Sequence, residues 1–191
     1  MIKNIILDVG GILFDDSRQN IERVLNKNCD SFFKKAYGNT FTNCLLGEMI
    51  VQEHVDLLKD DENYEDIKFL LKKENLCKSY PLIEKNFNYV KELKKKGYKL
   101  YLLTNITEDS FNYMNETINI DKIFDGGIYS YQEHLMKPNY DIYELLINKF
   151  KLKKDETIFF DDKEKNVVAA NEIGIKAVVF KSISDIENNL E

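Results

Sequence analysis

Short apolar segments recur along the chain and predict five buried β-strands. Each segment is too short for a helix, and most consist of β-branched, aromatic or leucine residues. The five segments are residues 5–7, 98–103, 128–129, 157–160 and 177–180. Continuous apolar strands are typical of sheets buried on both faces, so the pattern indicates a parallel sheet.

Three segments between these strands have apolar residues at helical spacing. They are residues 82–96, 140–150 and 163–173. The first ends at Gly97 and the third at Gly174, as expected of helices that close with a left-handed residue. The alternation of strands and helices predicts an α/β fold in which right-handed crossovers place helices on both faces of the sheet.

The alternation stops between Ser17 and Tyr80. Apolar residues recur there at helical spacing, and polar stretches separate them. We interpret residues 17–80 as an all-helical insert between the first and second strands. The sequence therefore predicts a core of residues 1–16 and 81–191 and one inserted helical unit, called the helical insert below.

Composition narrows the function classes. The 191 residues include 27 Lys plus Arg and 33 Asp plus Glu, and the net charge of -6 argues against a nucleic-acid partner. No apolar stretch approaches the roughly 20 residues of a membrane span, so we expect no membrane association. Cys29, Cys44 and Cys77 have no paired spacing, and we expect free thiols in the cytoplasm.

Polar residues follow four of the predicted strands. They are Asp8, Thr104, Asn105, Lys137 in the segment after residue 129, Asp161 and Asp162. Ligands bind outside the carboxyl ends of the strands in an open parallel sheet, so these side chains are expected to share one site.

The residue types at this edge suit phosphoryl transfer. The Asp8 carboxylate can attack phosphorus as a nucleophile and form an aspartyl-phosphate. Thr104 and the amides that follow it can hold phosphate oxygens, and Lys137 can balance developing negative charge. Asp161 and Asp162 are hard oxygen ligands suited to Mg²⁺.

In order and spacing, these segments resemble the four motifs of the haloacid dehalogenase-like hydrolase superfamily. The segments are Ile-Ile-Leu-Asp8-Val-Gly10-Gly11, Leu-Leu-Thr104-Asn105, Lys137-Pro138 and Phe-Phe-Asp161-Asp162 followed by Asn166. The resemblance implies a Rossmann-like core with an inserted helical-bundle cap at residues 17–80. It also implies Mg²⁺ dependence and phosphatase activity on a small phosphorylated metabolite.

The resemblance also implies a role for each residue. Asp8, Thr104 and Lys137 would be catalytic, and Thr104, Asn105 and Lys137 would bind substrate. The metal would be held by Asp8, the Gly10 carbonyl, Asp162 directly, and Asp161 directly or through water. Asn166 falls where the family has a polar residue that orients the metal shell or the lysine.

Gly10 departs from the family pattern, because phosphatases of this superfamily usually carry a second aspartate at that position. That aspartate is the acid and base toward the leaving group, and such help is worth roughly 10²–10⁴-fold in rate. A weakly basic leaving group, such as an anomeric hydroxyl or a carboxylate, tolerates its loss best. The chain also resembles a branch of sugar-phosphate phosphatases that has Gly at this position, and this resemblance implies a sugar 1-phosphate as substrate. Asp15 and Asp16 follow the first strand, and we expect turn or cap roles for them rather than substrate contact.

Two other functions fit parts of the sequence. Gly10 suits a binding or regulatory protein that has kept the fold without the chemistry. A metal-independent 2-haloacid dehalogenase would also lack the second aspartate. In that enzyme, however, Asp161 and Asp162 would be neighbouring like charges with no cation to screen them.

Overall fold

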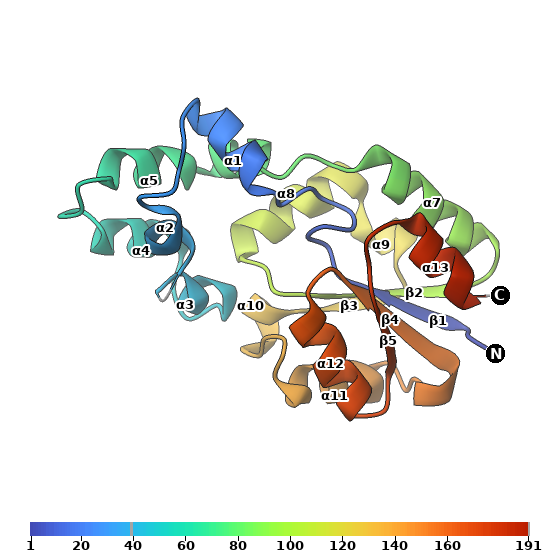
Figure 1. The fold of residues 1–191 in the computed structure, drawn as a ribbon. Coiled ribbons are helices and arrows are strands. Elements are labelled where there is room, and N and C mark those ends of the chain that lie inside the picture. Colours follow the sequence, from blue (N-terminus) through green and yellow to red (C-terminus); the bar gives the residue numbers. More distant parts are fainter. Residues whose placement is uncertain (39, 191) are drawn as a thin grey trace.

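A five-stranded parallel sheet forms the centre of the computed structural model, which describes residues 1–38 and 40–190 (Figure 1). The strands are β1 (Asn4–Leu7), β2 (Lys99–Thr104), β3 (Gly126–Tyr129), β4 (Thr157–Asp161) and β5 (Lys176–Val179). They lie in the order β3-β2-β1-β4-β5. The α/β fold and all five predicted strands are confirmed, and β3 begins two residues before the predicted segment.

Helices cover both faces of the sheet (Figure 1). One face carries α7 (Glu84–Lys95), α8 (Glu108–Ile118), α9 (Ile120–Ile123) and α13 (Ile183–Leu190). The other carries α11 (Tyr140–Lys149) and α12 (Glu164–Glu172). Two short elements, α10 (Ser130–Glu133) and a 3₁₀ turn (Lys154–Glu156), lie in the connections. The three predicted helices are confirmed.

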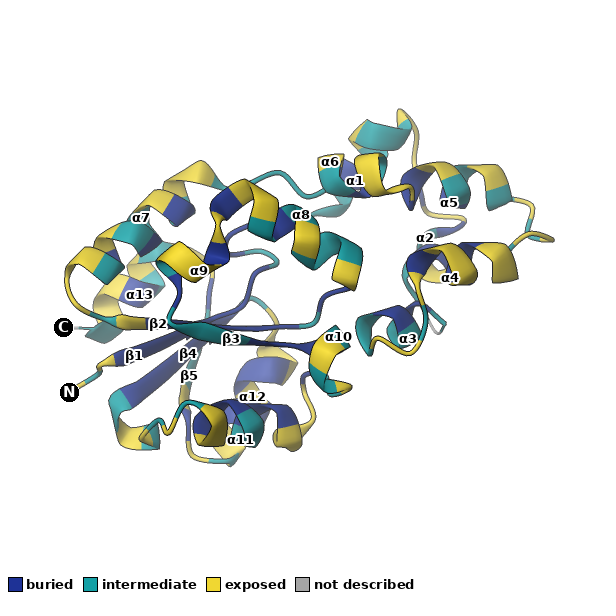
Figure 2. Cartoon of the chain, turned by 180° about the vertical axis from the view of Figure 1, so that it is seen from behind, coloured by how far each residue is buried: buried dark blue, intermediate teal, exposed yellow. Residues whose placement is uncertain are grey.

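Successive residues of β1 belong alternately to the two apolar clusters on the opposite faces of the sheet. Ile5 and Leu7 pack in the apolar cluster that includes α7 and α8, whereas Ile6 packs in the cluster that includes α11 and α12. Successive side chains of a strand point to opposite faces, which explains the division. Figure 2 shows the result, with buried strands and exposed residues on the outer faces of the helices.

Among the described residues between β1 and α7, six short helices lie beside the carboxyl ends of the strands (Figure 1). They are α1 (Arg18–Leu25), α2 (Phe33–Tyr37), α3 (Phe41–Leu45), α4 (Val51–Leu57), α5 (Tyr64–Leu70) and α6 (Lys73–Lys78). Ile21, Phe32, Ile67 and Leu70 belong to an apolar cluster of their own within this region. The expected all-helical character of the helical insert is therefore observed.

Two segments that lie side by side connect the helical insert to the core. The Asp15 amide donates to the Pro81 carbonyl at 2.9 Å, and the Ile83 amide donates to the Leu13 carbonyl at 2.8 Å. We propose that these paired segments mark the boundaries of two units, residues 17–80 and the remainder, as the sequence predicts.

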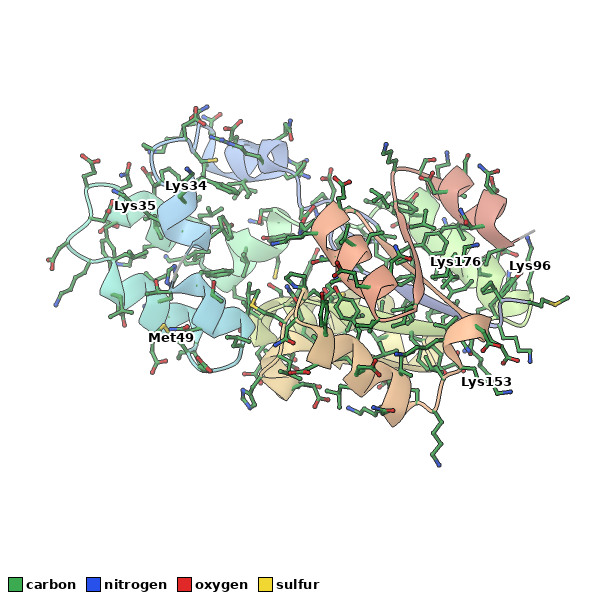
Figure 3. The ribbon with its side chains drawn as sticks, turned by 60° about the horizontal axis from the view of Figure 1, so that its bottom comes forward. Lys34, Lys35, Met49, Lys96, Lys153 and Lys176 are labelled. Atoms are coloured by element: carbon green, nitrogen blue, oxygen red, sulfur yellow. The ribbon has the colours of Figure 1, made fainter. Side chains whose placement is uncertain are left out.

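Several labelled lysines lie at the end of the molecule opposite the helical insert. Figure 3 places Lys96, Lys153 and Lys176 at the end of the sheet opposite the insert, near the starts of the strands. These lysines are therefore remote from the carboxyl ends where a ligand would bind. Within the described residues, no helix combines the length and the apolar character that crossing a membrane requires.

His54 on α4 is part of the interior of the helical insert. Its Nδ1 lies 2.8 Å from the Thr40 hydroxyl, and its Nε2 lies 3.0 Å from the Ala36 carbonyl oxygen. The carbonyl can only accept, so Nε2 carries a proton and Nδ1 accepts from Thr40. Burial lowers the pKa of His54, although the hydrogen bond to Ala36 opposes the shift. The ring is therefore a neutral structural element.

We expect His54 to make the protein less stable in mild acid. The folded-state pKa is below the ordinary value, so only the unfolded state binds the proton as pH falls through about 6.5. The free energy of unfolding should then decrease by up to about 1.4 kcal/mol per pH unit from this group. Urea unfolding of the wild type and His54→Gln between pH 5 and 8 measures the difference. Equal pH slopes for the two proteins would refute the assignment.

Candidate active site

The register of the sheet brings Asp8 next to Asp161. Leu7 pairs with Leu102 on one side and with Phe160 on the other, and the Asp8 amide donates to the Phe160 carbonyl at 3.0 Å. Strands β1 and β4 also flank the point at which the strand order changes direction. A crevice forms at such a point, outside the carboxyl ends of the strands, and ligands bind there.

The ammonium group of Lys137 lies between these two carboxylates. Lys137 Nζ is 2.9 Å from Asp8 Oδ1 and 2.6 Å from Asp161 Oδ2. All three side chains are buried, and Lys137 is only 1% exposed. Because a buried charge without a partner is costly, both carboxylates depend on Lys137. Asp8 Oδ1 also accepts from the Val9 amide at 2.7 Å. Asp8 Oδ2 accepts no hydrogen bond from the described residues.

Both oxygens of Asp161 accept hydrogen bonds within the protein. Oδ1 accepts from the Lys163 amide at 2.8 Å and from Asn166 Nδ2 at 2.9 Å. Oδ2 accepts from Lys137 at 2.6 Å and from Asn166 Nδ2 at 3.0 Å. Asn166 is buried at the start of α12, and its backbone carbonyl oxygen accepts from the Tyr143 hydroxyl at 3.0 Å. Asp161 is therefore a fixed anion that holds Lys137.

Asp162 is placed differently. Its Oδ1 is buried and has no hydrogen-bond partner among the described residues. The side chain packs against Gly11, where a Cβ atom would lie 2.9 Å from Asp162 Cγ and where φ is +68°. Only glycine adopts this conformation at low cost while allowing the close approach. The glycine turn after β1 thus makes room for a carboxylate that the protein itself does not satisfy.

Burial and the neighbouring carboxylates raise the pKa values of Asp161 and Asp162. Burial raises the pKa of Asp162 to about 6; Lys163 opposes this shift, and the charges of Asp8, Asp16 and Asp161 add to it. Burial, together with the Asp8 charge, also raises the pKa of Asp161 despite the neighbouring Lys137. For Lys163, burial opposes the charged form, but the four surrounding carboxylates outweigh it and raise the pKa. The site carries more negative than positive charge.

Three of the carboxylates could hold a metal ion together. Asp8, Asp161 and Asp162 each offer an oxygen, and these atoms all lie within 4.8 Å of one another. Oxygen donors of this kind suit a hard divalent cation such as Mg²⁺. Because the unpartnered oxygen of Asp162 is available and those of Asp161 are occupied, the arrangement fits direct binding by Asp162.

Thr104 and Asn105 end β2 beside this cluster. Thr104 is buried and lines the same cavity as Asp8. The Asn105 side chain accepts from the Lys137 amide at 2.8 Å and donates to the Lys137 carbonyl at 2.9 Å. Its amide group therefore positions the backbone of Lys137. The substrate contact expected of Asn105 stays a prediction.

Asp16 approaches the site at Gly10. A Cβ atom added at Gly10 would lie 2.7 Å from Asp16 Oδ2, so the Asp16 carboxylate occupies the space beside that glycine. Its side chain is 30% exposed and lies 3.6 Å from the ammonium of Lys163. Asp16, Lys163, Asp8 and Lys137 line one cavity. The loop after β1 thus supplies a carboxylate at the position where the second aspartate of the motif is missing.

A cavity of about 450 Å³ lies over this cluster, between the core and the helical insert. This volume is within the usual range for small-molecule sites. Charged side chains line the core end, and apolar side chains of the insert line the other end.

The sequence comparison identifies the family. The sequence profile of the family described as haloacid dehalogenase-like hydrolase matches residues 5–180. The chain belongs to this family. The resemblance of its four motifs is thereby confirmed, and the cluster around Asp8 is the candidate active site of a haloacid dehalogenase-like hydrolase.

Relatives of this hydrolase include several phosphatases. A sesquiterpene phosphatase from Aspergillus oryzae is 36% identical over 86 residues, and the match covers 45% of this chain and 44% of that protein. This chain therefore matches less than half the length of that relative. A phosphorylated carbohydrates phosphatase from Thermotoga maritima is 24% identical over 202 residues, which covers 98% of this chain and 89% of the relative.

A solved structure shows the same fold. It is a HAD family enzyme from Bacteroides thetaiotaomicron in complex with magnesium and inorganic phosphate. The TM-score is 0.80, the sequences are 20% identical, and the similarity covers 100% of both chains.

The structure brings together most of the residues that the sequence singled out in this hydrolase. Asp8, Thr104, Lys137 and Gly10 line the cavity, and Asp161 and Asp162 lie with Asp8. Sequence reasoning assigned Asp16 a turn or cap role and did not consider Lys163. The available signals were an Asp-Asp pair after the first strand and a lysine directly after the fourth motif.

We expect Lys137→Met to destabilise the fold as well as the site. The substitution leaves the buried carboxylates of Asp8 and Asp161 without their cation, which should cost roughly 3–5 kcal/mol in the free energy of unfolding. Urea unfolding in EDTA measures this change.

Lys34→Met is the matched control, because Lys34 is an exposed residue of α2. It should change the free energy of unfolding by less than about 0.5 kcal/mol. A Lys137 variant as stable as this control would show that the buried trio contributes little.

Proposed function

We propose that this hydrolase is a Mg²⁺-dependent phosphatase that transfers the phosphoryl group of its substrate to Asp8 and then to water. The observation that carries the proposal is the convergence of the Asp8, Asp161 and Asp162 carboxylates at the ends of β1 and β4, where Lys137 bridges Asp8 and Asp161. Four carboxylates gather where an anionic phosphate would bind, so a divalent cation there would reverse the local field in favour of the phosphate.

Asp162 and Asp8, with the carbonyl of Gly10, would hold the Mg²⁺ ion, and Asp161 would contribute directly or through water. When bound, the ion offsets the repulsion between the Asp8 carboxylate and an anionic phosphate and stabilises charge in the transition state. The unpartnered oxygen of Asp162 supports this assignment, because a buried acceptor without a donor is otherwise costly.

The residues of this chain have separate parts in the first step. Asp8 Oδ2 attacks phosphorus while the bond from phosphorus to the leaving oxygen breaks. Lys137 orients Asp8 through Oδ1 and leaves the other oxygen available. The Thr104 hydroxyl lines the cavity and binds a phosphate oxygen, whereas the Ile106 amide is already used in a hydrogen bond to Ser130 Oγ at 2.9 Å.

Asp16 is placed to carry the proton. In the protonated form it gives a proton to the leaving oxygen, which departs as an alcohol. The resulting Asp16 carboxylate then takes a proton from the water that attacks the phosphoryl-aspartate, and phosphate and free Asp8 result. Its position beside Gly10 supports this role, because that space is where the missing aspartate would lie.

Asp16 also bears on the alternative functions. Without an aspartate at position 10, the site would lack a general acid for the leaving group. That absence favours either a binding protein without catalytic activity or a substrate such as a sugar 1-phosphate, whose leaving group needs little protonation. A carboxylate beside Gly10 weakens both arguments. A metal-independent dehalogenase would leave the buried Asp162 oxygen without a cation.

The comparisons are consistent with a phosphorylated small molecule as substrate, since relatives are named as phosphatases of sesquiterpene and carbohydrate compounds. All three cysteines are free thiols, which suits the cytoplasm as the proposed location.

We expect Asp8→Asn to abolish phosphate release without unfolding the protein. The amide is isosteric and retains an acceptor for the Val9 amide, but it is not a nucleophile toward phosphorus. Phosphate release from para-nitrophenyl phosphate with Mg²⁺ should fall by at least about 10³-fold, while circular dichroism stays unchanged. Wild-type turnover in this variant, or equal activity of the wild type in Mg²⁺ and in EDTA, would contradict the mechanism.

We expect Asp16→Asn to affect poor leaving groups most. Loss of the proton donor should slow hydrolysis of an alkyl phosphate by roughly 10²–10⁴-fold and that of para-nitrophenyl phosphate by much less. The double variant Gly10→Asp/Asp16→Ala should recover part of the alkyl phosphate activity, because it returns a carboxylate to the same space.

Asp15→Asn is the control for this experiment, since Asp15 lies next in sequence but accepts from the Ser17 amide at 2.9 Å. It should leave the ratio of alkyl to aryl phosphate rates unchanged. An Asp16 variant that slows both substrates equally would assign the residue a structural role.

A further inference from the structure

We propose that the organic group of the substrate is apolar: the enzyme cleaves the phosphate ester of a hydrocarbon alcohol or phenol rather than that of a sugar. This inference rests on the proposed phosphatase function and adds the substrate class. It is carried by the side chains that the helical insert and its second connection contribute to the cavity.

The end of the cavity formed by the insert is lined mainly by hydrocarbon groups, and its polar atoms are the hydroxyls of Tyr37, Thr42 and Tyr80 and the thiol of Cys77. Its main contributors are Ile21 of α1, Phe33 and Tyr37 of α2, Phe41 and Leu45 of α3, and Leu76 of α6. Among the described residues that the insert contributes to the cavity, none is charged and none is an amide. Contact with this wall therefore favours the binding of an apolar group.

The charged side chains of the cavity all belong to the core end. They are Asp8, Asp16, Lys137, Lys163 and Lys165. The phosphate end and the organic end of a substrate would thus meet different chemistry. Such a division orients an amphiphilic phosphate ester, with phosphate at the carboxyl ends of the strands and hydrocarbon against the insert.

Several neutral polar groups near the core end already have partners. The Thr107 hydroxyl donates to Ser110 Oγ at 3.0 Å, and the Asn105 amide holds the backbone of Lys137. A sugar would bring several hydroxyls against these occupied groups and the apolar wall. Each hydroxyl buried without a partner costs roughly tenfold or more in affinity.

The remaining polar groups of the apolar end are uncharged. Burial raises the pKa of Tyr37 well above its ordinary value and that of Tyr80 to about 12, so both phenols stay protonated near neutral pH. They can hydrogen-bond to one or two oxygens of a ligand. A single hydroxyl or ether in the organic group is therefore compatible with this wall, whereas a polyol is not.

The length of the hydrocarbon chain of the substrate should determine kcat/KM. Each methylene that enters an apolar site gains about fourfold in kcat/KM, which corresponds to about 0.8 kcal/mol. The gain continues until the group fills the part of the roughly 450 Å³ cavity that the phosphate leaves free.

The test is a series of straight-chain alkyl phosphates from methyl to decyl, measured with Mg²⁺ beside glucose 1-phosphate and glucose 6-phosphate. We expect kcat/KM to rise with chain length, and hexyl phosphate to exceed both sugar phosphates by at least tenfold. A flat chain-length dependence, or sugar phosphates that are better substrates than hexyl phosphate, would overturn the proposed substrate class.

Two variants locate the effect. Leu45→Gln places an amide in the apolar wall and should flatten the chain-length dependence. Leu57→Gln is the matched control in the insert, because Leu57 is 60% exposed and does not line the cavity; it should keep the wild-type slope. Equal slopes in the two variants would show that this wall does not bind the organic group.

Binding to the Asp8→Asn variant separates this inference from the proposed function. Isothermal titration of the same alkyl phosphates should show an affinity that rises with chain length. If the wild type releases no phosphate from any substrate while this affinity rises, the phosphatase function fails and the apolar site stands. Turnover of the series without any chain-length dependence in rate or affinity leaves the phosphatase function intact and refutes the apolar site.

Discussion

The ion trio of Lys137, Asp8 and Asp161 is the interaction on which the rest of the site depends. One ammonium lies within 3 Å of two buried carboxylates, and removal of Lys137 would leave both of them without a cation in the interior. The surrounding groups maintain this arrangement: Asn105 fixes the backbone of Lys137, and Asn166 donates to both oxygens of Asp161. Stability and chemistry are therefore coupled at the ends of β1 and β4.

The trio leaves negative charge uncompensated, and Asp162 and Asp16 increase it. The raised pKa values of Asp161 and Asp162 express this excess, with burial as the first cause and neighbouring carboxylates as an addition. An anionic substrate and an acidic site are compatible only if a cation lies between them. The net negative charge of the chain argues against a nucleic-acid partner. The clustering of carboxylates at the ends of β1 and β4 supports a metal-dependent phosphatase.

Strands and motifs could be predicted from the sequence because both depend on local pattern: apolar runs define the strands, and polar residues at their ends define the site. The start of β3 was missed because Gly126 and Gly127 resemble a turn. A Cβ atom at Gly126 would lie 2.3 Å from the Phe150 ring, so the sheet requires glycine there. The place of Asp16 beside Gly10 and the apolar wall of the cavity depend on how loops and the helical insert fold back, which no local pattern encodes.

The central claim, that Asp8 carries the phosphoryl group, can be tested by trapping the intermediate. The enzyme is mixed with Mg²⁺ and a phosphate ester labelled with ³²P, quenched in acid within milliseconds, and digested with a protease. If Asp8 carries the phosphoryl group, the peptide that contains residue 8 will hold a hydroxylamine-sensitive label, and borohydride reduction will convert Asp8 to homoserine. Steady turnover with no label on that peptide, or with the label on another residue, would contradict the account.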